Sequence, residues 1–331
     1  MKPRIYGISI AVLILFVIGQ AFSGRNDSTD RHHLLLAHNL TPDHPVHLGM
    51  EFFKRKVAEK SDGRIQITIY PSGQIGSEKE VLELVQFGAI SMTKVNSLSL
   101  EAFSPLIGVL NVPFLFRDQA HLFSVLDGDT GKEILSIPTA QGLRGLTYYD
   151  AGDRSFYATK EIRVPDDVRG LKIRVMENAT AIRMLQLLGG SPTPMPFGDV
   201  YTALQQGVID GAENNISALT MSRHGEVAKF YSIVQHLFAP DILVISEDVW
   251  KKLSVDDQAI VSAAAEESKI YQREIWAKKL AESKIDAVEQ MGVKIIEPDK
   301  TPFIERVRPL HDEVAARGPE FKRLIEAIRN Q

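Results

Sequence analysis

The segment GLKIRVMENATAIRMLQLLGG (residues 170–190) joins a strand pattern to a helix pattern. Three apolar residues alternate with Lys172 and Arg174, which predicts a short strand with one polar face. The helix pattern NATAIRMLQLLGG follows almost at once, as in α/β folds. Ligands of such folds bind beyond the carboxyl ends of the strands. Arg174 therefore lies where such a fold presents its ligands, with an ordinary solvated sheet face as the alternative, and Lys172, which comes earlier in the strand, is expected to face solvent.

The same alternation of strand and helix runs along much of the chain. A strand is expected at residues 33–38, a helix at 45–60, a strand at 64–71 and a helix at 77–88. In the last of these, Ser77 and Glu80 form the pattern of a capping box, and Gly88 follows the helix. GLRGLTYY (142–149) predicts a further strand. This order predicts mainly parallel sheets with helices on both faces.

Residues 254–290 contain neither glycine nor proline and open with the capping pattern Ser254-x-x-Asp257. One helix over this range would be roughly 54 Å long at 1.5 Å per residue. Its apolar spacing is helical rather than strictly heptad, so a coiled coil is the weaker alternative. We expect a single helix long enough to span two lobes.

The first residues have the layout of a secretory signal. Lys2 and Arg4 precede an apolar run at 8–18, and small residues Ala21 and Ser23 come before a cut near residue 24. An uncleaved anchor is the alternative, but the run is short for a spanning helix. Removal of residues 1–23 lowers the 38 basic residues to 36 against 42 acidic ones, a net charge of −6. This balance argues against nucleic acid as a partner.

The chain has no cysteine, which excludes disulfides, thiol nucleophiles and a lipid-modified cysteine after the signal. We therefore expect a soluble protein in the bacterial periplasm. None of the common hydrolase, metalloprotease, phosphate-loop or dinucleotide motifs occurs. The nearest metal-like cluster, His38, His44 and His47, lacks matching carboxylates, and DGDTG (127–131) lacks the spacing of a calcium loop. We expect no cofactor and no metal.

Three segments carry a resemblance to a known family: DVRGLKIRV (167–175), GGSPTPMPFGDVYTALQQGVIDGAENN (189–215) and YPSGQIGSEKEVLELVQFGAISM (70–92). With LNVPFLFRD and the long helix, the chain resembles the DctP-type substrate-binding proteins of tripartite ATP-independent periplasmic (TRAP) transporters. The resemblance implies a two-lobed periplasmic-binding-protein fold, type II-like, with a cleft that closes on its ligand. We expect lobe 1 to hold residues 32–151 and 240–279, and lobe 2 residues 152–239 and 280–331.

The resemblance also implies which side chains bind the ligand. Arg174 looks like the group that holds the substrate carboxylate, because a guanidinium can donate two parallel hydrogen bonds to it. Asn214, the first of the two asparagines in the DGAENN motif (210–215), looks like a second ligand group. Arg154 of AGDRSF (151–156) looks like an arginine that assists Arg174. Four further positions fall where family members line the cleft: Asn39, Glu78 and Asn96 from the first lobe, and Phe197 as an apolar wall.

Some of these assignments have structural alternatives. Arg154 can instead pair with an acid, and Glu78 can be a first-turn acid favoured by the helix dipole. Glu213 can contact the ligand, orient Arg174 or cap a turn, and we favour an indirect role because two carboxylates repel each other. His38 and Asp241 can be cleft residues or ordinary strand-end residues.

The expected ligand is a sugar acid, either a uronate or an aldonate. Acids and amides in the cleft suit hydroxyl groups, whereas a plain dicarboxylate would need a second cation. The segment SRHGEVAKFYSIVQH (222–236) also resembles family members that bind sugar acids. The implied partners are the small and large membrane subunits of a TRAP permease, with the protein itself a monomer. Two alternatives remain: a periplasmic lyase that uses Tyr201 or His236 as base, and a sensor that reports ligand to a membrane kinase.

Overall fold

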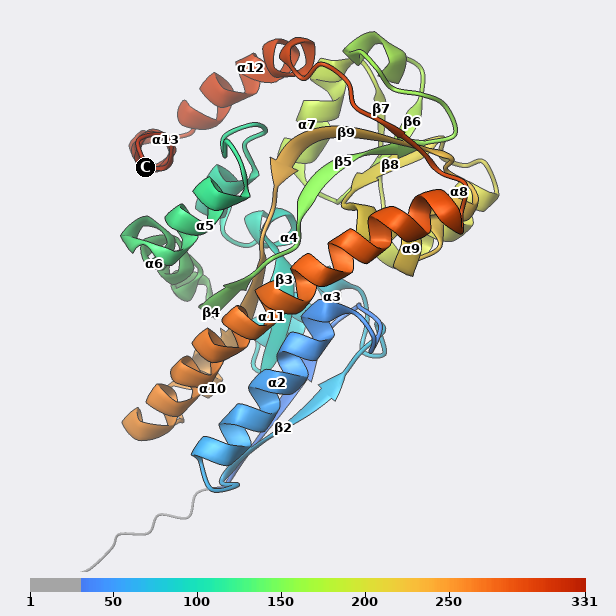
Figure 1. The fold of residues 1–331 in the computed structure, drawn as a ribbon. Coiled ribbons are helices and arrows are strands. Elements are labelled where there is room, and N and C mark those ends of the chain that lie inside the picture. Colours follow the sequence, from blue (N-terminus) through green and yellow to red (C-terminus); the bar gives the residue numbers. More distant parts are fainter. Residues whose placement is uncertain (1–30) are drawn as a thin grey trace, which may run out of the picture. The chain divides into compact units, whose positions relative to one another are not determined.

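The computed structural model describes residues 31–331, and its strands form two sheets (Figure 1). The first sheet has the order β2 (Ile65–Tyr70), β1 (His32–Ala37), β3 (Met92–Asn96), β10 (Asp241–Ser246) and β4 (Leu143–Tyr149). The second has the order β11 (Lys294–Ile296), β9 (Phe230–Phe238), β5 (Asp153–Ala158), β8 (Gly211–Asn214), β6 (Lys172–Val175) and β7 (Ser191–Pro194). The predicted two-lobed α/β fold is confirmed. The predicted signal, residues 1–23, lies outside the described residues.

The prediction of mainly parallel sheets is wrong, because both sheets are mixed. β1 pairs with β3, β6 with β7 and β8, and β11 with β9, all in parallel. β10 runs antiparallel to β3 and β4, and β5 antiparallel to β8 and β9. The reason is the path of the chain, which passes directly between the sheets from β4 to β5 and from β9 to β10, and returns to the second sheet through α11, which leads to β11.

The crossing strands also explain how the polar residues come together. β10 enters the first sheet where β3 ends, so its first residue, Asp241, pairs with Asn96, the last of β3. In the second sheet, β5 pairs near its start with the end of β8, where Ser155 lies opposite Asn214. Each crossing therefore brings a new polar side chain to the end of a strand that already carries one.

Twelve α-helices accompany the sheets over the described residues. They are α2 (Pro45–Lys60), α3 (Glu78–Gln86), α4 (Ser97–Glu101), α5 (Gln119–Asp127), α6 (Asp129–Ser136), α7 (Ala179–Leu188), α8 (Val200–Gln205), α9 (Ile216–Met221), α10 (Glu247–Trp250), α11 (Val255–Glu289), α12 (Thr301–Ala315) and α13 (Pro319–Arg329). The predicted helix at 45–60 coincides with α2. The predicted capping box of α3 is confirmed, since Ser77 accepts from the backbone N–H of Glu80 and the Glu80 carboxylate accepts from that of Ser77.

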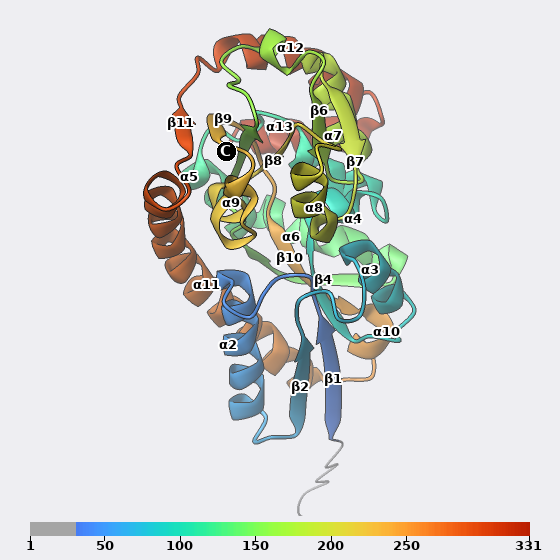
Figure 2. The ribbon, with the colours of Figure 1, turned by 90° about the vertical axis from the view of Figure 1, so that its right-hand side faces the viewer.

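The predicted long helix is confirmed as α11, a single helix of 35 residues that starts behind the N-cap Ser254. It packs against α2 and β4 of the first lobe and against α9 of the second (Figure 2). At the first crossing, the Gln272 amide donates to the Asp150 carbonyl at 2.8 Å and accepts from the Asp150 N–H at 2.9 Å. The buried Trp276 ring lies against Gly152. α11 thus holds the segment that joins the sheets.

The apolar core is continuous between the sheets. Its largest cluster combines Val95 and Leu98 of the first lobe with Phe156 and Ile173 of the second, and α12 and α13 contribute to it. All strands of the first sheet come from the segments predicted for lobe 1, and all strands of the second sheet come from those predicted for lobe 2. The exact bounds of the lobes stay a prediction. Across residues 31–331, no helix combines the length and apolar character needed to span a membrane.

Candidate functional site

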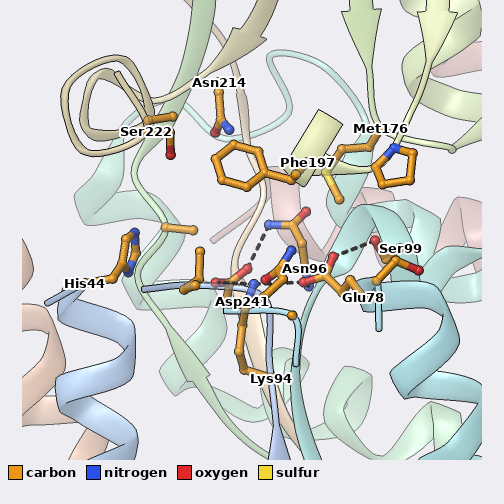
Figure 3. Close-up of a pocket in the computed structure, with 18 of the residues that line it drawn as sticks. His44, Glu78, Lys94, Asn96, Ser99, Met176, Phe197, Asn214, Ser222 and Asp241 are labelled. Carbon is orange, nitrogen blue, oxygen red and sulfur yellow. Dashed lines mark hydrogen bonds and ion pairs between the residues drawn. The ribbon is translucent and has the colours of Figure 1, made fainter. Parts of the chain in front are cut away.

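A cavity of about 570 Å³ is lined by side chains from both sheets (Figure 3). This volume is typical of small-molecule sites. Eight of the ten residues predicted for the site line it: Asn39, Glu78, Asn96, Arg154, Arg174, Phe197, Asn214 and Asp241. The other two, His38 and Glu213, are not among its lining residues. That the eight bind a ligand stays a prediction.

Arg174 is 2% exposed, and no carboxylate of residues 31–331 lies within ion-pair distance of it. Its Nε and Nη2 groups both donate to the Met195 carbonyl, at 3.0 and 2.8 Å. The Phe197 ring centre lies 6.0 Å from the guanidinium carbon. Burial lowers the pKa of Arg174 from its ordinary value. Lys172, two residues earlier, is exposed as predicted. Arg174 is thus a buried cation beside a cavity, without a paired anion.

Arg154, by contrast, is fully paired. Its Nε donates to Glu213 Oε2 at 2.6 Å, and its Nη2 donates to Glu213 Oε1 at 2.8 Å. Burial alone would raise the pKa of Glu213, but Arg154 and His236 bring it down to about 2. Burial would lower the pKa of Arg154, yet Glu213 raises it. The two form a buried neutral pair, the structural alternative anticipated for Arg154.

The Arg154–Glu213 pair also orients Asn214. The Asn214 side-chain oxygen accepts from Arg154 Nη1 at 3.1 Å and from the Asn215 N–H at 2.9 Å. An amide oxygen has two lone pairs, and these two hydrogen bonds use both of them. What remains is the amide nitrogen, so Asn214 can act on the cavity only as a hydrogen-bond donor.

The first lobe presents a second charged cluster (Figure 3). Lys94 Nζ lies 2.8 Å from Glu78 Oε1 and 3.4 Å from Asp241 Oδ2. Ser99 donates to the second Glu78 oxygen at 2.7 Å, and Asn96 donates to Asp241 Oδ1 at 3.0 Å. The Lys94, Glu78 and Asp241 side chains are all less than 10% exposed.

Burial and mutual attraction compete in this cluster. Burial would raise the pKa of Glu78, but Lys94 and hydrogen bonds hold it below the ordinary value. Burial would lower the pKa of Lys94, but Asp241 and Glu78 raise it. Burial, together with the nearby Glu78 charge, raises the pKa of Asp241 despite Lys94. Lys94 thus forms ion pairs with both acids and lies closer to Glu78, at 2.8 Å, than to Asp241, at 3.4 Å.

His38 and Asn39 behave differently although they are adjacent. His38 Nδ1 accepts from the Leu40 N–H at 3.1 Å, so its Nε2 carries the proton donated to His47 Nδ1 at 3.0 Å. Burial, with Lys94 adding to it, lowers the pKa of His38 to about 2. Asn39 lines the cavity, and its buried side-chain oxygen has no hydrogen-bond partner.

The three histidines considered as metal ligands do not converge on a point. His44 Nδ1 accepts from the Val46 N–H at 3.2 Å and caps α2, while His38 and His47 bond to each other. Across residues 31–331, no group of three or more histidines and acids is arranged to hold a metal ion.

The sequence reasoning missed Lys94, His44 and Trp276, all of which line the cavity. Lys94 had a usable signal, since it precedes Asn96 by two residues in a strand and so shares its face. His44 was considered only as a metal ligand. Trp276 had no local signal, because it lies in the long helix and its place depends on tertiary packing.

Comparison with known proteins identifies relatives along almost the whole described chain. The model of the DctP family, described as bacterial extracellular solute-binding protein, family 7, matches residues 36–317. The C4-dicarboxylate-binding periplasmic protein DctP of Rhodobacter capsulatus is 31% identical over 300 residues, covering 88% of this chain and 89% of the relative.

Two solved structures are similar in both fold and sequence. The TRAP periplasmic solute-binding protein of Anaerococcus prevotii, with bound α/β-D-glucuronate, has a TM-score of 0.88 and 37% identity, covering 91% of this chain and 98% of that one. The corresponding protein of a Bradyrhizobium species, in complex with α/β-D-galacturonate, has a TM-score of 0.88 and 39% identity, covering 91% and 100%.

Proposed function

The chain belongs to the DctP family, the family-7 bacterial extracellular solute-binding proteins, and we propose that the solute it binds is a hexuronate such as D-galacturonate or D-glucuronate. The observation that carries the proposal is Arg174, a buried cation that lines the cavity and has no paired anion. A buried charge is stable only when it is paired, so the site is complete only with an anionic ligand.

The hydrogen-bond pattern of Arg174 favours a carboxylate in particular. The edge formed by Nε and Nη2 is taken by the Met195 carbonyl. The other edge, formed by the two terminal nitrogens, keeps one hydrogen on each. Two parallel N–H groups match the two oxygens of a carboxylate. A lysine could not hold the Met195 carbonyl and a carboxylate in this way, because its ammonium is a point charge.

The remaining groups suit the hydroxyls and the ring of a sugar. Asn214 offers a donor, while Glu78 and Asp241 offer acceptors on the opposite lobe. Phe197 offers an apolar surface beside Arg174. We propose that the unpaired side-chain oxygen of Asn39 and the side chain of Asn96 also contact ligand hydroxyls. Arg154 and Glu213 hold Asn214 in place. His38 supports the wall of the cavity from behind.

The ligands of the two similar structures support a uronate, and one relative suggests a rival class. Both solved relatives hold hexuronates at 37% and 39% identity. The Rhodobacter capsulatus relative is named for C4-dicarboxylates. A dicarboxylate would need a second unpaired cation, but Lys94 lies between two acids. We therefore rank a dicarboxylate second.

The transport role follows from the family. We propose that the chain is exported by cleavage of residues 1–23, acts as a monomer in the periplasm, and closes on its ligand because contacts from both lobes coexist only in the closed state. The closed form would then deliver the ligand to the small and large subunits of a TRAP permease. No cofactor is required. Tyr201 and His236, the bases considered for a lyase, are not among the residues that line the cavity.

A thermal-shift panel on the protein without residues 1–23 tests the ligand class. A ligand at one hundred times its Kd stabilises the folded state by about 2.7 kcal/mol, which raises Tm by roughly 4 °C for a chain of this length. We expect D-galacturonate or D-glucuronate to give this shift, and galactose, succinate, pyruvate and amino acids to give none. Galactose is the matched control, since it lacks only the carboxylate. A response to succinate alone would reject the proposal, and conversion of the uronate, detected by mass spectrometry, would favour the lyase.

A further inference from the structure

Among their buried side chains, the two lobes present opposite charges to the cavity; the other charged residues that line it, Lys79, Glu80, Glu177 and Asp199, are exposed. On the second lobe, Arg154 and Glu213 cancel each other, so Arg174 leaves a net charge of +1. On the first lobe, Glu78 and Asp241 share the single ammonium of Lys94, which leaves a net charge of −1 when all three are ionised. A ligand in the cavity therefore lies between a cationic wall and an anionic wall.

The anionic wall is built to accept hydrogen bonds. Glu78 accepts from Lys94, from the Ser99 hydroxyl and from the Asn96 backbone N–H, and Asp241 accepts from the Asn96 amide and forms an ion pair with Lys94. A carboxylate has about four lone-pair positions, so each acid can still accept from a ligand hydroxyl. A second ligand carboxylate, by contrast, brings only acceptors and a like charge.

The positive charge of Lys94 does not make this wall a site for a second ligand carboxylate. Its ammonium already lies within ion-pair distance of both acids, and its side chain is 5% exposed. A ligand carboxylate that approached Lys94 would also approach Glu78 and Asp241. The lysine thus limits the repulsion between the two acids without becoming an anion site of its own.

We propose that the Glu78–Lys94–Asp241 cluster is a charge filter that selects sugar acids with one carboxylate and rejects aldarates, the sugar diacids oxidised at both ends. The inference rests on the proposed function, because it assumes that the first carboxylate of the ligand lies on Arg174. Hydroxyl or hemiacetal groups at the other end of a uronate would donate to the cluster. An aldarate would place its second carboxylate there.

Calorimetry with D-galacturonate and galactarate tests the filter, since galactarate carries a second carboxylate in place of the C1 aldehyde and is therefore open-chain; the charge-removing variants separate the effect of charge from that of the ring. Like charges in contact at an interface cost several kcal/mol, so we expect wild-type protein to bind galactarate roughly 100-fold more weakly. Asp241→Asn removes the charge and keeps the shape, and should narrow this ratio about tenfold. Glu78→Gln should act in the same direction. Glu83→Gln removes one charge from an exposed position of the same helix and should leave the ratio unchanged.

Each outcome decides one point. Wild-type protein that binds both acids within threefold overturns the filter and leaves the uronate proposal intact. Wild-type protein that binds neither acid overturns both. A large wild-type ratio that Asp241→Asn and Glu78→Gln leave unchanged overturns the assignment to this cluster. If either variant fails to fold, as judged by circular dichroism, the other variant and the wild-type ratio still decide the matter.

Discussion

Glu213→Gln tests whether the buried Arg154–Glu213 pair stabilises the second lobe. Glu213 is 1% exposed, and its pKa falls from 4.5 to about 2 in the folded protein. At 1.36 kcal/mol per unit, ionised Glu213 contributes roughly 3 kcal/mol at neutral pH. Measured costs of breaking a buried ion pair are similar, about 3–5 kcal/mol. Unfolding entropy of about 2.1 cal/mol/K per residue converts this loss into a Tm decrease of roughly 5 °C.

The exposed pair Arg183–Glu313 provides the matched control. Arg183 donates to Glu313 through Nε at 2.9 Å and Nη2 at 2.6 Å, the same two-point geometry, but both side chains are about 40% exposed. Surface pairs contribute about 0–1 kcal/mol, so Glu313→Gln should lower Tm by less than 2 °C.

The pH dependence of the Glu213→Gln effect follows from the direction of the pKa shift. A lowered carboxylate pKa stabilises the fold above the unfolded pKa near 4.5, and this stabilisation is lost as pH falls toward the folded value near 2. The difference in Tm between wild type and Glu213→Gln should therefore be full at pH 5–7 and shrink below pH 4.5. Equal effects of Glu213→Gln and Glu313→Gln at pH 7 would refute the reasoning.

Two further predictions concern stability. His224 Nδ1 and the Tyr157 hydroxyl form a hydrogen bond of 2.8 Å. Burial, together with Arg174, lowers the pKa of His224 to about 4, so the stability that this shift provides is present above pH 6.5 and lost as pH falls toward 4. Over this pH range, the free energy of unfolding measured in urea should fall by up to about 1.4 kcal/mol per pH unit more in wild type than in His224→Gln. Parallel pH profiles of the two proteins would contradict this. Gly211→Ala should cost about 1–3 kcal/mol, because a Cβ there would lie 2.5 Å from the Tyr157 carbonyl, whereas Gly198→Ala meets nothing within 4 Å; equal melting of the two variants would contradict the packing argument.

Local patterns in the sequence were sufficient to predict several of the helices and strands. The capping box at Ser77 and Glu80 and the cap at Ser254 fix helix starts through neighbouring residues alone. Period two placed Lys172 and Arg174 on the same face of the strand at 172–175, and their positions along the strand correctly separated exposed Lys172 from buried Arg174. These features depend on backbone geometry within a few residues, so they can be predicted from a single sequence.

Features that depend on long-range pairing were harder to predict. The antiparallel strands β5 and β10 arise from the path of the chain between the sheets, which no local pattern encodes. A local pattern puts Lys94 on the same strand face as Asn96, but its ion pairs with Glu78 and Asp241, 16 and 147 positions away in the chain, depend on long-range packing. Most residues named for the cavity came from the family resemblance rather than from the physics of their own segments.

Calorimetry of D-galacturonate binding to Arg174→Ala and Lys172→Ala tests the central claim most directly. The two cations lie on one strand, but Arg174 lines the cavity and Lys172 is exposed. Truncating one partner of a buried charge pair costs about 2–5 kcal/mol or more, so Arg174→Ala should bind at least roughly 30-fold more weakly. Lys172→Ala should bind within twofold of wild type. Wild-type affinity in Arg174→Ala, or an equal loss in both variants, would contradict the claim that Arg174 holds the carboxylate of the ligand.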